Sequence, residues 1–282
     1  MSERRDPEQV LAGFPGVSGA SVARQLSDGP TNASYEVSAG DTRYLLRIDK
    51  PAASRLGLDR AAEEQLYAII AAAGLGPQPT WFDADAGVFL RPFLPGRSWV
   101  RQDLEQAENL QRLAQLLRKL HGLPVPANRF DPLAAARRYA DRIGSGEAEA
   151  LFSRAEKAHK CLPAAMPVLC HNDLVCQNVL ESETLTLIDW EYAGAGDACF
   201  DLAVVVEHHD MPEQLEQHFL DGSEAKLVFV CHSRGGLVAR HALALLAGDK
   251  TWGERLGELI TFGTPHDGAA IAESTTGRET AA

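Results

Sequence analysis

The chain has 282 residues, of which 45% are hydrophobic and 23% charged, and a formal net charge of −12. This length supports one large or two modest domains. The negative charge argues against non-specific binding to nucleic acid or an anionic membrane, because either needs a cationic face. The charged start at 1–10 lacks the apolar core of a signal peptide, and no run of about 18 apolar residues occurs. We therefore expect a cytoplasmic protein without a membrane span.

Residues 16–50 alternate apolar stretches with turn residues, which predicts a β-hairpin turning at Gly40-Asp41. Residues 60–73 then carry apolar side chains at helical spacing, and the helix is expected to stop at Gly74. These patterns predict a small sheet-rich lobe with one packed helix. Its expected strands are Tyr35–Val37, Tyr44–Ile48, Trp81–Phe82 and Val88–Phe93.

The middle of the chain is predicted to be mainly helical. A long amphipathic helix is expected first, because leucines recur on one face between Leu104 and Leu123. Short apolar runs around a polar loop follow between Pro167 and Leu187. The other expected helices are Leu133–Ile143, Ala148–His159 and Phe200–Glu207.

The most informative stretch has the spacing HxDxxxxN, formed by His171, Asp173 and Asn178, with Asp189 at the end of a following apolar strand. Kinase-type folds use this spacing to place a base and two magnesium ligands around a phosphoryl group. Hard oxygen ligands suit Mg²⁺. We therefore predict Asp173 as the base or hydroxyl-orienting group, and Asn178 and Asp189 as metal ligands.

Two residues near this motif have predicted accessory roles. His171 is expected to brace the loop by hydrogen bonding rather than to take part in the chemistry. Glu191 is expected to assist through a water molecule or to touch the substrate.

Upstream residues supply the cations that phosphates require. Arg47 lies in a predicted strand where kinases place their phosphate-contacting lysine, and Glu63 or Glu64 on the next helix would be its ion-pair partner. A turn at residues 29–34 offers backbone amides and polar side chains to a triphosphate. These side chains belong to Thr31, Asn32 and Ser34.

The motifs resemble the aminoglycoside phosphotransferase, choline kinase and thiamine kinase superfamily over about residues 16–220. The resemblance is carried by GPTNASYEV, YLLRID, AAAGLGPQP, RPFLPG, LRKLHGLP, LCHNDLVCQNVL and LIDWEYAGAGDACFDLA. It implies an α+β, two-lobed protein-kinase-like fold, with a sheet-rich N-lobe at 1–93 and a mainly helical C-lobe at 94–222.

The resemblance also implies a function. ATP and Mg²⁺ would be the cofactors, and a small hydroxylated metabolite, choline-like, thiamine-like or aminoglycoside-like, would be the acceptor. The adenine slot would lie at Phe93 and Leu94, and Asp201 would support the catalytic loop structurally.

The C-terminal segment 223–282 departs from this pattern. It resembles a truncated lipase-like α/β-hydrolase: a strand at Lys226–Cys231, a HSRGG turn with Ser233 as the nucleophile, a helix, and a second strand at Leu259–Phe262. A triad acid and histidine in the required order are not recognisable. Two strands and one helix cannot close a core, so we expect docking on the kinase-like lobe, an oligomer or partner chain, or poor order.

Three functional hypotheses therefore stand. The first is an ATP-dependent small-molecule kinase, whose activity is in question because the expected substrate-binding helices are not recognisable after Gly222. The second is a serine esterase working through Ser233. The third is a catalytically inactive nucleotide-binding fusion protein. The five cysteines are odd in number and lack paired metal-ligand spacing, so reduced thiols are expected.

Overall fold

The structure is a computed structural model that describes residues 5–14, 16, 19–160, 166–209, 211–212, 215–216, 218–220, 227–232 and 256–262. The chain divides into two compact units. Unit 1 comprises Met1–Asp103, Lys119–Phe130 and Val168–Gly196, and unit 2 comprises Leu104–Arg118, Asp131–Pro167 and Asp197–Ala282.

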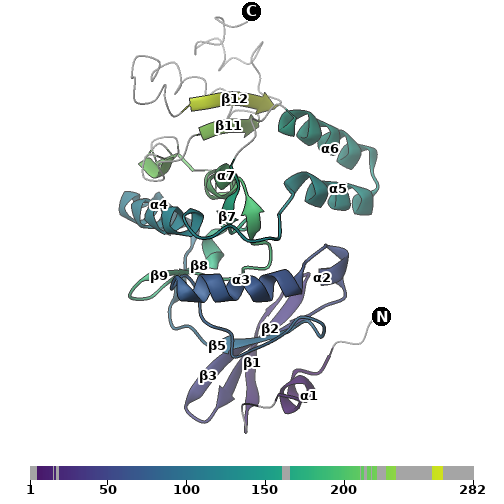
Figure 1. The fold of residues 1–282 in the computed structure, drawn as a ribbon, viewed down its shortest axis with the longest axis vertical. Helices are drawn as coiled ribbons and strands as arrows, with labels where there is room; N and C mark the ends of the chain where they lie inside the picture. The colour runs from purple at the N-terminus through teal and green to yellow at the C-terminus, as the bar shows by residue number, and fades with distance from the viewer. Residues whose placement is uncertain are drawn as a thin grey trace, which may run out of the picture. The chain divides into compact units, whose positions relative to one another are not determined.

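Unit 1 is built on a five-stranded antiparallel sheet with the strand order β1-β2-β3-β5-β4 (Figure 1). The hairpin of β2 and β3 has a regular register from Asn32↔Asp49 to Ala39↔Thr42. The strands are β1 (Ser21–Asp28), β2 (Asn32–Ala39), β3 (Thr42–Asp49), β4 (Trp81–Asp83) and β5 (Val88–Pro92).

The two faces of the sheet pack differently because side chains alternate along each strand. One face is apolar and covers a core that includes Leu46 and Leu90, with Leu11 of the short helix α1 (Pro7–Ala12) packed on it. The other face presents Phe89, whose ring lies 4.9 Å from that of Tyr67 on helix α3. The second face therefore carries α3, which crosses the sheet in Figure 1.

Helix α3 (Arg60–Ala72) begins where Asp59 caps it by accepting a hydrogen bond of 3.0 Å from the amide of Ala62. Its buried residues include Glu63, Tyr67 and Ile70. The helix ends one residue before the predicted Ala73, and Gly74 follows with a φ of 66°, a conformation that glycine adopts without strain. The short helix α2 (Ala52–Arg55) precedes α3.

The remaining strands of unit 1 place the HxDxxxxN motif and Asp189 on two loops. Strand β7 pairs with β10, and β8 lies between β6 and β9. The HxDxxxxN loop begins immediately after β7 and includes the 3₁₀ helix η2, and Asp189 follows β9. The elements are β6 (Arg97–Ser98), β7 (Val168–Cys170), η2 (Cys176–Asn178), β8 (Val179–Glu181), β9 (Leu185–Leu187) and β10 (Gly194–Gly196).

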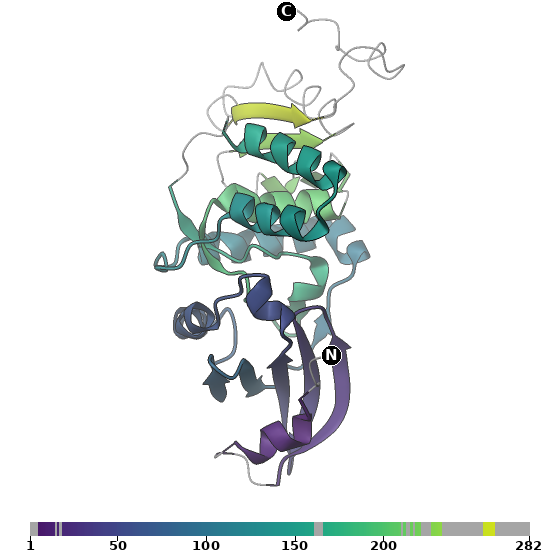
Figure 2. The same ribbon diagram turned by 90° about the vertical axis from the view of Figure 1, so that its right-hand side faces the viewer.

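The described part of unit 2 is mainly helical. Helices α5 (Pro132–Ile143) and α6 (Gly146–His159) form a hairpin that turns at Gly144, whose φ is 63° (Figure 2). Helix α7 (Ala198–His208) follows, and strands β11 (Leu227–His232) and β12 (Leu256–Phe262) pair in parallel. Helix α4 (Ala107–His121) begins in unit 2 and ends in unit 1, and the 3₁₀ helix η1 (Arg101–Glu105) precedes it.

Most predicted elements are confirmed to within a few residues, including the two parallel strands of the C-terminal segment. The predicted helix 104–123 was too long, because its first turn is the separate helix η1. Strand β1 was missed, and so were α1, α2 and the short strands β6, β8 and β10. The predicted elbow at Ser233 lies outside the described residues, and the predicted domain boundaries stay predictions.

Cys170, Cys176 and Cys199, whose side chains the structure describes, are not joined in disulfide bonds. Burial raises the pKa of the Cys176 thiol, which keeps it protonated and poorly reactive. None of the helices in the described ranges combines the length and apolar character that crossing a bilayer requires.

Candidate active site

The loop after β7 brings Asp173 and Asn178 together. The Asn178 side-chain amide donates hydrogen bonds to the backbone carbonyl of Asp173 at 2.8 Å and to its Oδ2 at 3.0 Å. Asp173 is partly exposed, whereas Asn178 is buried. Asn178 therefore fixes the orientation of the Asp173 carboxylate while leaving part of it open to solvent.

His171 lies beneath this loop and is fully buried. Its Nδ1 accepts a hydrogen bond of 3.3 Å from the amide of Asp173, so Nε2 carries the proton and donates to the carbonyl of Ile188 at 3.0 Å. The ring also contacts Trp190, with centroids 4.6 Å apart. This geometry fits the predicted bracing role, because His171 joins the Asp173 loop to the segment that carries Asp189.

A backbone bond joins the same two segments: the amide of Ile188 donates to the carbonyl of Asn178 at 3.0 Å. The residue after it, Asp189, has a φ of 65°, and Asn172 has a φ of 64°. Left-handed backbone at residues other than glycine costs free energy and gathers at functional sites. Asp189 is itself a predicted metal ligand, and Asn172 directly precedes the predicted base Asp173.

Arg47 and Glu63 form a buried, two-pronged ion pair between β3 and α3. Nη1 and Nη2 of Arg47 each lie 2.8 Å from a carboxylate oxygen of Glu63, and the side chains are 6% and 1% exposed. The structure thus selects Glu63 over Glu64, which is exposed. Burial would lower the pKa of Arg47, but the Glu63 carboxylate outweighs it and holds the pKa above its ordinary value.

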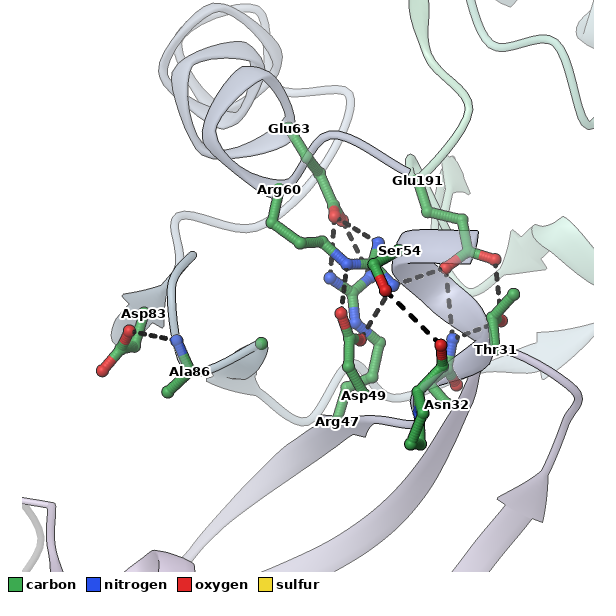
Figure 3. Close-up of polar contacts among 12 residues, drawn as sticks. Thr31, Asn32, Arg47, Asp49, Ser54, Arg60, Glu63, Asp83, Ala86 and Glu191 are labelled. Carbon is green, nitrogen blue, oxygen red and sulfur yellow. Dashed lines mark hydrogen bonds and ion pairs between the residues drawn. The ribbon is translucent and has the colours of Figure 1, made fainter. Parts of the chain in front are cut away.

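Arg60 contacts three carboxylates at once, as Figure 3 shows. Its Nε and Nη2 lie 2.7 and 2.8 Å from the two oxygens of Asp49, and Nη1 lies 2.7 Å from Glu63. Nη2 also lies 3.0 Å from Glu191, and the Arg60 side chain is 6% exposed. Arg60 therefore joins the end of β3, helix α3 and the segment that follows Asp189.

The predicted phosphate loop is held by Glu191. Thr31 donates from Oγ1 to one Glu191 oxygen at 3.1 Å, and Asn32 donates from Nδ2 to the other at 3.2 Å. Thr31 and Asn32 are both buried. Their side chains therefore face Glu191, which lies two residues after the candidate metal ligand Asp189 (Figure 3).

The electrostatics of the site fit a divalent cation. Loss of water raises the pKa of the Asp189 carboxyl, and the nearby Glu63 and Asp173 carboxylates raise it further against the opposing Arg47. Loss of water and the negative charge of Asp189 likewise raise the pKa of Glu191. Such shifts mark carboxylates whose charge is under-compensated, and oxygen ligands of this kind suit Mg²⁺.

The other predicted site residues have these places. Ser34 is partly buried on β2, opposite Arg47. Phe93 donates its amide to the carbonyl of Arg43 at 2.9 Å, so this amide is engaged, and Leu94 is partly buried. Asp201 is fully buried in the first turn of α7, in unit 2, and its predicted supporting role stays a prediction.

Sequence reasoning missed Arg60, Asp49 and Arg91. A cation in the first turn of a helix opposes the helix dipole, so Arg60 at the start of α3 was a detectable signal for a nearby carboxylate. Arg91 is 7% exposed on β5, and its side chain donates to the carbonyl of Pro92 at 3.0 Å. Burial lowers the pKa of Arg91. No pattern in the sequence distinguished this arginine from an exposed one.

A cavity of about 1060 Å³ borders the ion network within unit 1. Asp49 and Arg60 contribute to its lining, together with Lys50 and α2. Asp173, Asn178 and Asp189 do not line it, so it is separate from the candidate reacting groups.

The ion pair between β3 and α3, together with the loops that carry Asp173 and Asp189, is the arrangement of a kinase-like phosphotransferase. Comparison with known families agrees: the model of the Phosphotransferase enzyme family matches residues 22–228. The chain belongs to this family. The model of the Putative serine esterase (DUF676) family matches residues 205–278, in agreement with the resemblance predicted for the C-terminal segment.

Individual relatives point in the same direction. Protein LicA of Haemophilus influenzae is 29% identical over 208 residues, which cover 68% of this chain and 60% of that protein. The chain therefore spans less than two thirds of this relative. The crystal structure of choline kinase LicA from Streptococcus pneumoniae matches with a TM-score of 0.64 and 22% identity, covering 72% of this chain and 76% of that chain.

A second solved structure, spectinomycin phosphotransferase in complex with ADP and spectinomycin, matches with a TM-score of 0.51 and 17% identity, covering 84% of this chain and 85% of that chain. Both structural matches confirm the predicted kinase-like α+β fold.

Proposed function

We propose that the chain is an ATP- and Mg²⁺-dependent phosphotransferase that acts on the hydroxyl group of a small metabolite. The observation that carries the proposal is the joining of two acidic loops. The hydrogen bonds from Ile188 to Asn178 and from His171 to Ile188 hold Asp173 and Asn178 beside the segment of Asp189. Membership of the phosphotransferase family supports this reading.

The roles follow from the chemistry of the side chains. Asn178 and Asp189 would hold Mg²⁺, which neutralises phosphate charge when bound. Asp173 would accept the proton of the acceptor hydroxyl, since its carboxylate is partly exposed and oriented by Asn178. Arg47 would contact the phosphates with its fixed positive charge, which Glu63 holds in place.

The acceptor belongs to the choline-like, thiamine-like or aminoglycoside-like class. LicA of S. pneumoniae is described as a choline kinase, and spectinomycin phosphotransferase is described in complex with ADP and spectinomycin. A choline-like acceptor takes precedence, because the sequence relative that spans most of the matched region is also a LicA protein.

Phosphoryl transfer from MgATP to a panel of choline-like, thiamine-like and aminosugar alcohols tests the proposal. The wild-type chain should phosphorylate at least one class, and Asp173→Ala should lower kcat by about 10³-fold while ATP binding stays within threefold. Asp141→Ala, which removes an exposed aspartate of α5, is the matched control and should leave kcat unchanged. MgATP binding without transfer to any alcohol would favour the catalytically inactive alternative.

The match of residues 205–278 to the serine esterase family favours one alternative activity. Ser233 would be its nucleophile, and it lies outside the described residues. A fluorophosphonate probe should label the wild-type chain at Ser233 if this elbow is activated, with Ser233→Ala as the unlabelled control. Absence of labelling in the folded chain removes the esterase reading.

A further inference from the structure

Arg60 contacts two carboxylates in addition to that of Glu63. Its guanidinium uses four donor contacts on three carboxylates, those of Asp49, Glu63 and Glu191. These acceptors come from three elements: the end of β3, helix α3, and the loop after Asp189, of which the last is 131 residues from Arg60 in sequence. Arg47, by comparison, forms an ion pair with Glu63 and with no other carboxylate of the described residues.

Among the contacts of Arg60 with described residues, only the one with Glu191 reaches beyond strand β3 and helix α3. Glu191 accepts from Arg60 at 3.0 Å and, on the same carboxylate, from Thr31 and Asn32 at 3.1 and 3.2 Å. Its side chain is 7% exposed. The phosphate loop is therefore tied to helix α3 through one buried carboxylate and one buried guanidinium (Figure 3).

The local charge balance shows why this tie needs an arginine. The carboxylates of Asp49, Glu63, Asp173, Asp189 and Glu191 stand against the guanidiniums of Arg47, Arg60 and Arg91, a formal excess of two negative charges. Glu191 is two residues from Asp189, so the two carboxylates repel each other. A planar guanidinium can donate two hydrogen bonds to the Asp49 carboxylate and still donate to Glu191. The single ammonium of lysine cannot reproduce this geometry.

We infer that Arg60 is a positioning residue for phosphoryl transfer: it holds Glu191 in place, and through Glu191 it holds the phosphate loop at Thr31 and Asn32 against the metal-binding segment. This inference rests on the proposed function. Arg60 acts through other side chains and need not touch the nucleotide. Its removal releases the loop and leaves Glu191 free to move toward or away from Asp189.

The test compares Arg60→Met, Arg60→Lys, Glu191→Gln and the double variant R60M/E191Q. The affinity for MgATP is measured by calorimetry, and kcat and KM are measured wherever transfer is detected. Arg60→Met should weaken MgATP binding by about tenfold, and Arg60→Lys should recover only part of it. Because both residues act through one contact, the double variant should bind MgATP no more weakly than the worse single variant.

A second readout does not depend on nucleotide. Hydrogen exchange of the amides in residues 29–34 should quicken by about tenfold in Arg60→Met and Glu191→Gln, because the tie to Glu191 is lost. Asp49→Asn is the matched control: it weakens another of the three carboxylate contacts of Arg60, lowers stability, keeps the contact with Glu191, and should leave exchange at 29–34 unchanged. Arg55→Met, an exposed arginine of α2, should change neither readout.

Several outcomes would overturn the inference. Multiplicative effects of R60M and E191Q on MgATP affinity mean that the two residues act separately. Unchanged exchange at 29–34 in folded Glu191→Gln means that the tie does not hold the loop. If the wild-type chain fails to bind MgATP, the proposed function fails, while the exchange experiment still decides whether Arg60 positions the loop. If Arg60→Met does not fold, Arg60→Lys and Glu191→Gln carry both readouts.

Discussion

At the scale of single residues, the site contains buried carboxylates whose surroundings destabilise the charged form and therefore lower the stability of the folded chain. Asp189 has left-handed backbone and a carboxyl whose pKa is raised by loss of water and by neighbouring negative charge. In the absence of a bound cation, a group with these properties lowers the free energy of unfolding. The strain and the charge thus point to function rather than to packing.

This cost predicts the effect of Asp189→Asn on stability. The unfolded-state pKa of Asp189 is near 3.8 and its folded-state pKa is higher, so ionisation of Asp189 lowers stability as the pH rises through that interval. Asp189→Asn should therefore raise the free energy of unfolding at pH 7 by about 1 kcal/mol, and by less at pH 4. Urea unfolding at both pH values checks this. Equal or lower stability of the variant at pH 7 would contradict it.

Arg91 gives a second prediction at this scale. Within the described part of the chain it makes one hydrogen bond, to the Pro92 carbonyl, and no ion pair, although it is 7% exposed. The nearby Asp189 carboxylate attracts the Arg91 charge without forming an ion pair with it, and burial still lowers the pKa of Arg91. Replacing such a buried, incompletely compensated charge with an apolar side chain of similar length is often stabilising. Arg91→Met should raise the free energy of unfolding by about 1 kcal/mol.

The control for Arg91 is Arg43→Met, which removes a half-exposed arginine paired with Glu36. It should lower stability by less than about 1 kcal/mol, as surface ion pairs do. A loss of more than 1 kcal/mol in Arg91→Met would mean that the Arg91 charge is compensated in the folded chain.

At the scale of elements, the buried pair of Arg47 and Glu63 fastens α3 to β3. Removing one charge leaves Arg47 and Arg60 without a shared carboxylate, so Glu63→Gln should lower the free energy of unfolding by about 3 kcal/mol. Glu149→Gln, which breaks an exposed pair with Arg137, is the matched control and should cost less than about 1 kcal/mol.

The same pair gives a pH dependence with a definite sign. Burial would raise the pKa of Glu63, but Arg47 and Arg60 outweigh it and hold the pKa below its ordinary value of 4.5. The stabilisation is therefore complete above about pH 4.5 and is lost as the pH falls through the folded-state pKa. Glu63→Gln should flatten this part of the acid limb in thermal unfolding. An acid limb that is unchanged in the variant would count against the assignment.

The elements also show what a single sequence can reveal. The α3 pattern was readable because its apolar residues follow the helical period and Gly74 ends it. Strand β1 was not readable: it lies at the edge of the sheet, most of its residues are exposed, and register irregularities interrupt its alternation at Val22/Arg24 and Gln25/Ser27.

The candidate site could be predicted only in part, because only some of its residues lie close together in the sequence. Asp173, Asn178 and Asp189 have a characteristic local spacing, so their pattern could be recognised. The contact of Arg60 with Glu191 joins residues 131 positions apart. Nothing local in the sequence specifies such a contact, and only the fold brings the two side chains together.

At the scale of the whole molecule, every described residue with a proposed role toward nucleotide or metal belongs to unit 1. We therefore expect MgATP to slow hydrogen exchange in residues 29–34 and 168–196 and to leave the α5–α6 hairpin of unit 2 unchanged. Exchange measured by mass spectrometry with and without MgATP checks this. Protection confined to α5–α6 would place the nucleotide elsewhere.

The central claim is that Asp173, Asn178 and Asp189 converge on a metal-bound nucleotide. Calorimetric titration of MgATP into the wild-type chain and into Asp189→Asn tests it most directly, with folding of both checked by circular dichroism. We expect Mg²⁺-dependent binding by the wild type and a loss of about tenfold or more in affinity in Asp189→Asn. Equal affinity of the two proteins for MgATP, or no binding by the folded wild type, would contradict it.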